Sequence, residues 1–300
     1  MPAKKSHYEQ LRKKWLKRHD EARKNLHEKH KEALDYVIDK FPAKDKLASS
    51  AVGLLMLSSV VPASTALLPV TDAENTHVVA AQGYNKSKLL GELSLTVPEE
   101  MRALTPEEEA KIGEVLSRNF NAKVSADING LRLNRSYGYI GAEQHLMRYP
   151  GDTMATHLTP SEASNHMIYS SGMAPGRGAW GYFAKSKAEM NQTVVERERW
   201  YIATQTFLAP NYKGRLSEYR DFFKYRKMLL VNTKTGQTVV CDIGDAGPAE
   251  WTGKHLGGSP EVMYHLGYGG GSRKGSVLYF FIDDPEDRIP LGPVEESQKI

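Results

Sequence analysis

The stretch from residue 239 to residue 267 reads VVCDIGDAGPAEWTGKHLGGSPEVMYHLG and carries the strongest fold signal in the chain. Its first five residues are apolar apart from Asp242, which predicts a short buried strand. Gly-Pro at 247–248 predicts a rigid turn directly after Asp245. A small helix then ends at Leu266-Gly267. A segment of this kind delivers a carboxylate to a strand end, where functional side chains are commonly placed.

The sequence on both sides of this stretch predicts an α+β protein. Residues 228–232 and 238–243 predict a hairpin across a Gly-containing loop, and residues 277–282 predict a strand that is buried on both faces. Upstream, Thr105-Pro106 followed by three glutamates predicts the start of a helix that ends near Arg118, because Thr caps, Pro suits the first turn and acids favour the helix N-terminus.

The hairpin, turn and helix together resemble the rare lipoprotein A-like double-psi β-barrel, a superfamily that includes expansins and the barrels of some lytic transglycosylases. The matching segments are Asp245-Ala-Gly-Pro248, Gly253-Lys254, Ser259-Pro-Glu-Val-Met263 and Leu266-Gly267. Residues 178–183, GAWGYF, are similar to the opening strand of that family, and residues 200–205 to its Ala-Ala-His segment. The resemblance covers roughly residues 172–285 and implies a six-stranded barrel there.

Two positions depart from the family pattern. Thr204-Gln205 stands where family members have a His, and Gly257-Gly258 precedes Ser259 where they have an Asp before Leu-Ser. The second carboxylate of the family's groove is therefore missing at residue 257.

The N-terminal part of the chain predicts an amphipathic helix followed by a membrane segment. Apolar residues recur at three- and four-residue steps between residues 6 and 40. Residues 47–70 contain no charge, and about 20 apolar residues are enough to span a bilayer. Lys and Arg are concentrated before this segment, which predicts a cytoplasmic N-terminus and an extracytoplasmic C-terminal part. The alternatives are a cleaved signal segment, with small residues at 64–66, and a buried soluble helix.

We therefore expect a single-pass cell-membrane protein of five parts. They are a basic helical arm (1–46), a transmembrane or signal segment (47–70), a linker with a small helical and loop region (71–171), the double-psi barrel (172–285) and an acidic, Pro-rich tail (286–300).

Composition excludes several functional classes. Residues 1–46 carry a net charge of +6, so the rest of the chain carries −2 of the total of +4, and a nucleic-acid-binding domain is not expected. Cys241 is the single cysteine and lies in a predicted strand, which excludes an intramolecular disulfide and a Cys-based zinc cluster.

Asp245 is the candidate catalytic acid. Lytic transglycosylases, as the resemblance implies, cleave the β-1,4 glycan bond of peptidoglycan with one carboxyl group that acts first as an acid and then as a base. Ordinary glycosidases need two carboxyl groups. Asp before Ala-Gly-Pro is also a good turn residue, so a purely structural role is the alternative. Strand alternation places Asp242 on the opposite face, unless the turn at Gly244 re-aims one of them.

The expected groove contains further candidates for substrate binding. Aromatic rings can stack on sugars, although in β domains they more often pack in the core. The candidate substrate-binding residues are Asp242, Trp251, His255, Ser259, Trp180 and Tyr182.

The resemblance implies no cofactor, and no metal site is expected. Residues 137–157, YGYIGAEQHLMRYPGDTMATH, hold Glu143, His145, Asp152 and His157, but their spacing does not match a signature such as H-E-x-x-H. A packing loop is the preferred interpretation. Two functions remain open: a membrane-anchored peptidoglycan lytic transglycosylase, and a non-catalytic module that binds a wall glycan or a partner protein.

Overall fold

The computed structural model describes Lys17, Glu21, residues 84–270 and residues 273–296. The chain divides into two units, Met1–Ala73 and Glu74–Ile300, and nearly all described residues belong to the second. Lys17 and Glu21 are helical, but the rest of the predicted basic arm and the whole apolar segment at 47–70 lie outside the described residues. None of the described helices is long and apolar enough to cross a membrane.

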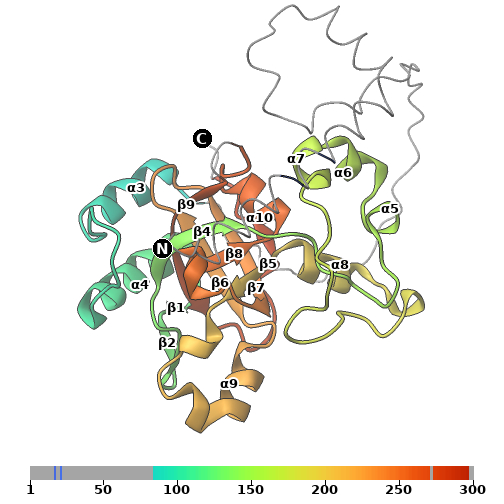
Figure 1. Ribbon diagram of the computed structural model, residues 1–300. Coiled ribbons are helices and arrows are strands. Elements are labelled where there is room, and N and C mark those ends of the chain that lie inside the picture. Colours follow the sequence, from blue (N-terminus) through green and yellow to red (C-terminus); the bar gives the residue numbers. More distant parts are fainter. Residues whose placement is uncertain (1–16, 18–20, 22–83, 271–272, 297–300) are drawn as a thin grey trace, which may run out of the picture. The chain divides into compact units, whose positions relative to one another are not determined.

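A mixed six-stranded β-barrel forms the centre of the second unit (Figure 1). Its strands are β4 (Tyr137–Ala142), β5 (Tyr201–Thr204), β6 (Lys227–Asn232), β7 (Thr238–Ala246), β8 (Leu256–Gly258) and β9 (Lys274–Ile282). The order around the barrel is β4-β8-β5-β7-β6-β9, and β9 pairs with β4 to close it. The β4–β8 and β5–β7 pairs are parallel and the other barrel pairs are antiparallel. This pattern is consistent with a double-psi barrel.

Alternation along the strands explains how the barrel is filled. In β7, Val239, Cys241 and Ile243 belong to the core cluster inside the barrel, whereas Val240 belongs to a second cluster outside it. Cys241 is fully buried, as its position in an apolar strand predicts. Successive side chains of a strand point to opposite faces, so one strand serves both cores.

Two helices cover one side of the barrel and bury the second cluster (Figure 1). They are α3 (Lys86–Ser94) and α4 (Pro106–Phe120). The start of α4 has the predicted chemistry: the Thr105 side chain accepts a hydrogen bond from the Glu108 backbone, and the Glu108 side chain accepts one from the Thr105 backbone. Leu89, Ile112 and Leu116 are fully buried in the resulting layer.

A long connection between β4 and β5 covers another part of the barrel. It carries α5 (Met154–His157), α6 (Pro160–Ser164), α7 (His166–Tyr169) and α8 (Gln192–Arg199), and Figure 1 shows these helices on the side opposite α3 and α4. We call residues 143–200 the insertion.

Shorter elements complete the unit. They are β1 (Val124–Ser125), which pairs with β9, the two-stranded sheet of β2 (Asp127–Ile128) and β3 (Leu131–Arg132), α9 (Leu216–Phe223), α10 (Pro260–His265) and β10 (Gly292–Pro293), which pairs with β7.

The front of the barrel differs from the sequence prediction. Its first strand is β4, so the barrel begins at residue 137, inside the region expected to be linker and loop, rather than at residue 172. Residues 178–183 form no barrel strand, and Gly178 and Gly181 make only an isolated bridge around a turn. The prediction was wrong because the glycines that mark β4 also suggest a loop, and the insertion separates β4 from the other strands.

Candidate functional site

Asp245 lies near the end of β7 and is held by backbone hydrogen bonds. Its Oδ1 accepts bonds from the backbone N–H groups of Ala179, at 2.6 Å, and Ala246, at 2.8 Å. Its Oδ2 has no hydrogen-bond partner among the described residues, and the side chain is only partly buried. Burial raises the pKa of the Asp245 carboxyl, and the two N–H donors partly oppose that rise. One oxygen is therefore fixed and the other is available to a ligand.

A row of small residues extends from Asp245 across the outer face of the barrel. Asp245 is paired with Ala203, Ala203 with Gly257, and Gly257 with Gly141. The neighbouring residue Ile202 belongs to the interior cluster, so alternation directs this row outward. We call Asp245, Ala203, Gly257 and Gly141 the outer strip.

Glu143 and Lys254 lie over the glycines of the outer strip. A Cβ atom on Gly257 would be 2.3 Å from Glu143 Cγ, and one on Gly141 would be 2.2 Å from Lys254 Cδ. Lys254 Nζ donates a 2.6 Å hydrogen bond to Glu143 Oε1. Glu143 thus brings a carboxylate over Gly257, the position at which the sequence lacks the Asp of the family pattern. Sequence reasoning missed this role because Glu143 directly follows β4, which is distant from Gly257 in the chain.

Asp242 is on the same side of β7 as Asp245, contrary to simple strand alternation. It is paired with Tyr201, and the pairing then shifts so that Gly244 is skipped and Asp245 faces Ala203. Asp242 is 1% exposed, neither carboxylate oxygen has a hydrogen-bond partner, and Arg197 Nε lies 3.9 Å away. Burial raises its pKa well above the usual range.

The surroundings of Asp242 separate it from the outer strip. It lines a pocket of about 380 Å³ together with Arg197, Tyr225 and Lys227, among others, and this pocket does not include Asp245. The structure therefore does not bring the two acids together as one site.

Trp180 and Tyr182 belong to the loop of the insertion that covers Asp245. Trp180 packs against the barrel core and donates a 2.9 Å hydrogen bond from Nε1 to the Ile243 carbonyl. Tyr182 is half-buried with the Arg177 guanidinium 5.8 Å from its ring centroid. Arg177 and Arg220 line a pocket of about 540 Å³ with Trp180 and the backbone that binds Asp245.

Trp251 and His255 lie in the connection between β7 and β8. Trp251 is 88% exposed and so is free to contact a partner. His255 stacks on Tyr139 and accepts a 2.8 Å hydrogen bond at Nδ1 from the Tyr139 backbone. Burial and the positive charges of Arg135 and Lys274 lower the pKa of His255 to about 4, so the ring is neutral at pH 7.

Ser259 and Gln205 are occupied by the fold. Ser259 is fully buried, caps α10 by accepting from the Val262 N–H group, and donates to the Arg199 carbonyl at 2.6 Å. The hydroxyl thus donates one bond and accepts one within the fold, and the side chain is closed off from solvent. Gln205 donates from Nε2 to the carbonyls of Pro248 and Lys254 and joins the two ends of the β7–β8 connection.

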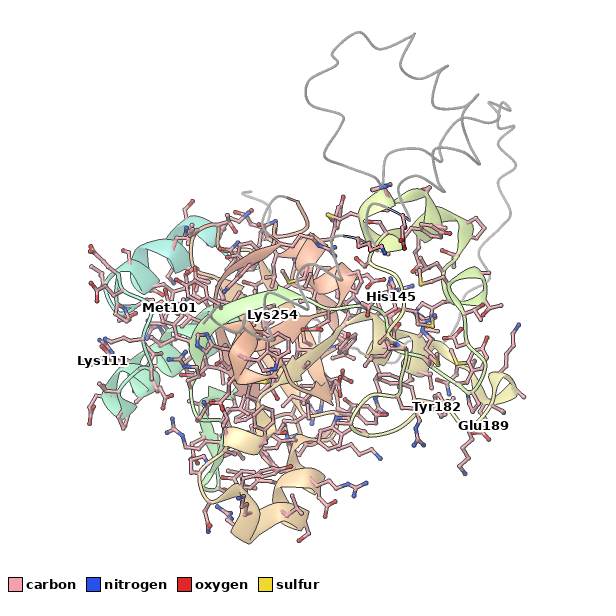
Figure 2. All side chains as sticks on the ribbon, viewed as in Figure 1. Met101, Lys111, His145, Tyr182, Glu189 and Lys254 are labelled. Atoms are coloured by element: carbon pink, nitrogen blue, oxygen red, sulfur yellow. The ribbon has the colours of Figure 1, made fainter. Side chains whose placement is uncertain are left out.

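The His-containing loop after β4 forms a buried charged network. His157 contacts Asp152 through Nδ1 at 2.7 Å and Glu198 through Nε2 at 2.8 Å, and Arg148 Nε donates to Glu198 at 3.1 Å. Burial opposes charge on His157, but the two carboxylates outweigh it and raise the His157 pKa to about 9. Burial raises the pKa of Glu261 to about 7. Figure 2 shows His145 beside the barrel, near the start of the insertion, and Lys254 over the barrel.

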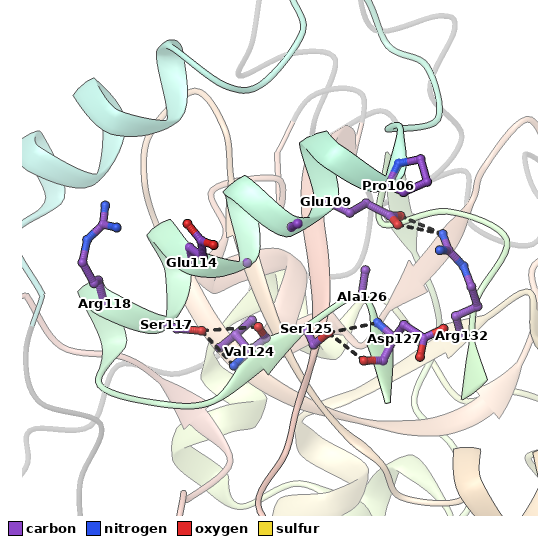
Figure 3. A pocket seen from close by; sticks show the side chains of 12 residues that line it. Pro106, Glu109, Glu114, Ser117, Arg118, Val124, Ser125, Ala126, Asp127 and Arg132 are labelled. Carbon is purple, nitrogen blue, oxygen red and sulfur yellow. Dashed lines mark hydrogen bonds and ion pairs between the residues drawn. The ribbon is translucent and has the colours of Figure 1, made fainter. Parts of the chain in front are cut away.

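A separate pocket of about 580 Å³ lies between α4 and the β1–β3 segment (Figure 3). Polar side chains that line it are bonded within the fold: Arg132 contacts both oxygens of Glu109, and Ser117 and Ser125 bond to the neighbouring backbone. None of the outer-strip residues lines this pocket. We place the candidate site at the outer strip, because Asp245 and the Glu143–Lys254 pair lie there.

Comparisons with known proteins identify no relative of this chain, so its barrel architecture is the most specific classification it has. The likeness to a double-psi barrel rests on strand order and direction in the part of the chain that the structure describes. No family model, no curated protein and no solved structure matches the chain.

Proposed function

We propose that the barrel is a peptidoglycan lytic transglycosylase in which Asp245 is the single catalytic acid. The observation that carries this proposal is the asymmetric environment of the carboxyl group: Oδ1 accepts two backbone hydrogen bonds, and Oδ2 has none in the described residues. A carboxyl fixed in this way keeps its free oxygen in one orientation. Its raised pKa favours the protonated form that a general acid requires.

The reaction balances with this one group. Asp245 gives its proton to the glycosidic oxygen as the bond from that oxygen to the sugar C1 breaks. The 6-hydroxyl of the same N-acetylmuramic acid attacks C1 and closes an anhydro ring, and the Asp245 carboxylate takes the hydroxyl proton. The acid is thereby regenerated, and neither water nor a cofactor is consumed.

The surroundings of Asp245 fit a substrate that carries both sugars and carboxylates. Arg177 and Arg220 line the adjoining pocket, where they would attract the carboxylates of a muropeptide. The exposed ring of Trp251 offers a stacking surface for a sugar. On the other side of the outer strip, the Glu143–Lys254 pair presents polar groups to hydroxyls.

Digestion of purified sacculi tests the proposal. The wild-type chain should release soluble anhydro-muropeptides, and Asp245→Asn should lower that rate by about 10²–10⁴-fold, the usual contribution of a general acid. Asp221→Asn, at an exposed aspartate on α9, is the matched control and should leave the rate unchanged. Wild-type release of anhydro products by Asp245→Asn would rule out the assigned acid.

The second candidate function is binding without cleavage. It is favoured by Gln205, whose amide occupies the position of the family's His and is committed to two backbone carbonyls. In this case the sacculi would pellet the protein and release no fragment, and Trp251→Ala would weaken pelleting while Asp245→Asn would not.

The proposed substrate requires that residues after 70 lie outside the cytoplasm, with residues 47–70 as the membrane segment. External protease applied to intact cells should then digest the C-terminal part. Protection of that part until the membrane is opened would contradict this placement.

A further inference from the structure

The buried network beside the outer strip leaves metal-ligating atoms without partners. His145 is fully buried, and its Nδ1 atom has no hydrogen-bond partner. Both carboxylate oxygens of Glu261, which is 5% exposed, also lack a partner. These atoms face one another: His145 Nδ1 is 3.9 Å from Glu261 Oε2 and 3.6 Å from Glu198 Oε1. Unpaired polar groups at this depth are costly and call for a further binding partner.

The hydrogen bonds of the two histidines leave one ring nitrogen of each facing the centre of the network. His145 Nε2 lies 3.2 Å from the Ile168 carbonyl, which can only accept, so Nε2 carries the proton and Nδ1 is available. His157 Nδ1 lies 2.7 Å from Asp152, so Nε2 faces Glu198, and a metal ion bound there would replace the proton that lies between Nε2 and Glu198. Histidines that bind metal commonly donate their outer N–H group to a carboxylate or a backbone carbonyl in this way.

The separations suit a small cation. One ligand atom each from His145, His157 and Glu198 lie within 4.8 Å of one another. Tetrahedral zinc with bonds of about 2.0–2.2 Å places its ligand atoms roughly 3.3–3.6 Å apart, so small side-chain adjustments are enough. Mixed nitrogen and oxygen ligands favour zinc over magnesium or calcium, which select oxygen alone.

We propose that His145, His157 and Glu198 bind a structural zinc ion, with Glu261 as the fourth ligand. The charges balance formally, because the ion and Arg148 offset the carboxylates of Asp152, Glu198 and Glu261. Arg148 and the Leu146 backbone N–H both donate hydrogen bonds to Glu198, and these bonds would orient its carboxylate toward the ion.

This site would fix the insertion to the barrel. His145 follows β4, His157 ends α5, Glu198 lies on α8 and Glu261 lies on α10. The ion would therefore join four segments of the chain, and one of its ligands, His145, is two residues from Glu143, which lies over the outer strip. Such a site could not match a short spacing signature, which explains why the sequence alone argued against a metal.

Metal analysis of the full chain tests the proposal. Zinc-supplemented wild type should retain one more zinc per chain than the His145→Ala/His157→Ala double variant, and cobalt(II) substitution should give the visible absorption of a tetrahedral site. Glu261→Gln, which preserves volume, should weaken zinc binding at least tenfold. His166→Ala, at an exposed histidine on α7, is the control and should retain the zinc.

Thermal unfolding provides a second readout that does not depend on the variants. Removal of zinc from the wild type by a chelator should lower the Tm by roughly 5–15 °C, and added zinc should restore it. Equal zinc content in wild type and double variant, or a wild-type Tm that is the same with chelator and with zinc, would overturn the proposal. The buried histidines and carboxylates would then be satisfied by shared protons, without a metal ion.

Discussion

Asp242 and Asp245 are three positions apart in one strand and have different environments. Asp245 has a partly exposed carboxyl group with two N–H donors on one oxygen. The Asp242 carboxyl is buried and accepts no hydrogen bond. The positive charges of Arg197 and Lys227 favour its ionised form, and the negative charge of Asp287 opposes it. The first arrangement suits a group that acts on a ligand, and the second costs stability whenever the carboxyl is charged.

Replacement of Asp242 by Asn should therefore stabilise the protein at neutral pH. The folded-state pKa lies above the unfolded value of about 3.9, so folding opposes ionisation and the wild type loses stability as pH rises from that value through the folded pKa. The gain in Asp242→Asn should be about 1 kcal/mol, roughly 2–4 °C in Tm. Melting curves should show the gain at pH 8 and a smaller one towards pH 4. A lower Tm for Asp242→Asn at pH 8 would show that the charged carboxyl is stabilising.

At the scale of secondary-structure elements, Ser259 illustrates how a predicted ligand contact becomes a structural one. It begins α10, a short helix whose residues Val262 and Met263 are fully buried in the barrel core. Its hydroxyl binds the Val262 N–H group and the Arg199 carbonyl, which joins the helix to the end of α8.

Ser259→Ala should therefore reduce stability and leave the proposed binding to sacculi unchanged. Loss of an N-cap costs about 0.5–2 kcal/mol, and urea unfolding should show a decrease of this size. Ser170→Ala, at an exposed serine after α7, should change the free energy of unfolding by less than about 0.5 kcal/mol. Weaker pelleting with sacculi at unchanged stability would restore the role in substrate binding.

The glycines of β8 and β4 act at the same scale, because they leave room for the Glu143–Lys254 pair on the sheet. Gly257→Ala should displace Glu143, since the new Cβ would be 2.3 Å from its Cγ atom. The side chain can rotate away, so stability should fall by less than about 1 kcal/mol, the range of a partly exposed ion pair. Under the proposed function, release of anhydro-muropeptides should fall at least tenfold. Gly176→Ala, where no atom lies within 4 Å of the new Cβ, should change neither quantity.

At the scale of the whole molecule, the described residues of both hydrophobic clusters all belong to the second unit. Among the described residues, the interior cluster and the cluster under α3 and α4 draw on residues from 84 onward, and the barrel closes on itself. A unit with its own core is expected to fold by itself.

A chain that starts at Glu74 should therefore have the same Tm as the corresponding transition of the full chain, within about 2 °C. Calorimetry of the two proteins under identical conditions provides the measurement. A Tm lower by more than 5 °C in the shorter chain would mean that residues 1–73 stabilise the barrel.

The sequence by itself determined the elements whose signals are local. Two strand-like runs across a Gly-containing loop predicted the β6–β7 hairpin, a continuous apolar run predicted β9, and the Thr105–Glu108 pattern predicted the start of α4. The pattern of matching motifs also indicated a six-stranded barrel. These signals are readable because each depends on residues within a few positions of one another.

Only the tertiary structure decided how distant segments complete the site. The insertion separates β4 from β5, so neither the opening strand nor the place of Glu143 over Gly257 could be read from spacing. The bulge at Gly244 places Asp242 and Asp245 on the same side of β7. The carboxylates that face His145 come from α8 and α10. Side chains meet through strand pairing and packing, whose long-range contacts a one-dimensional pattern does not record.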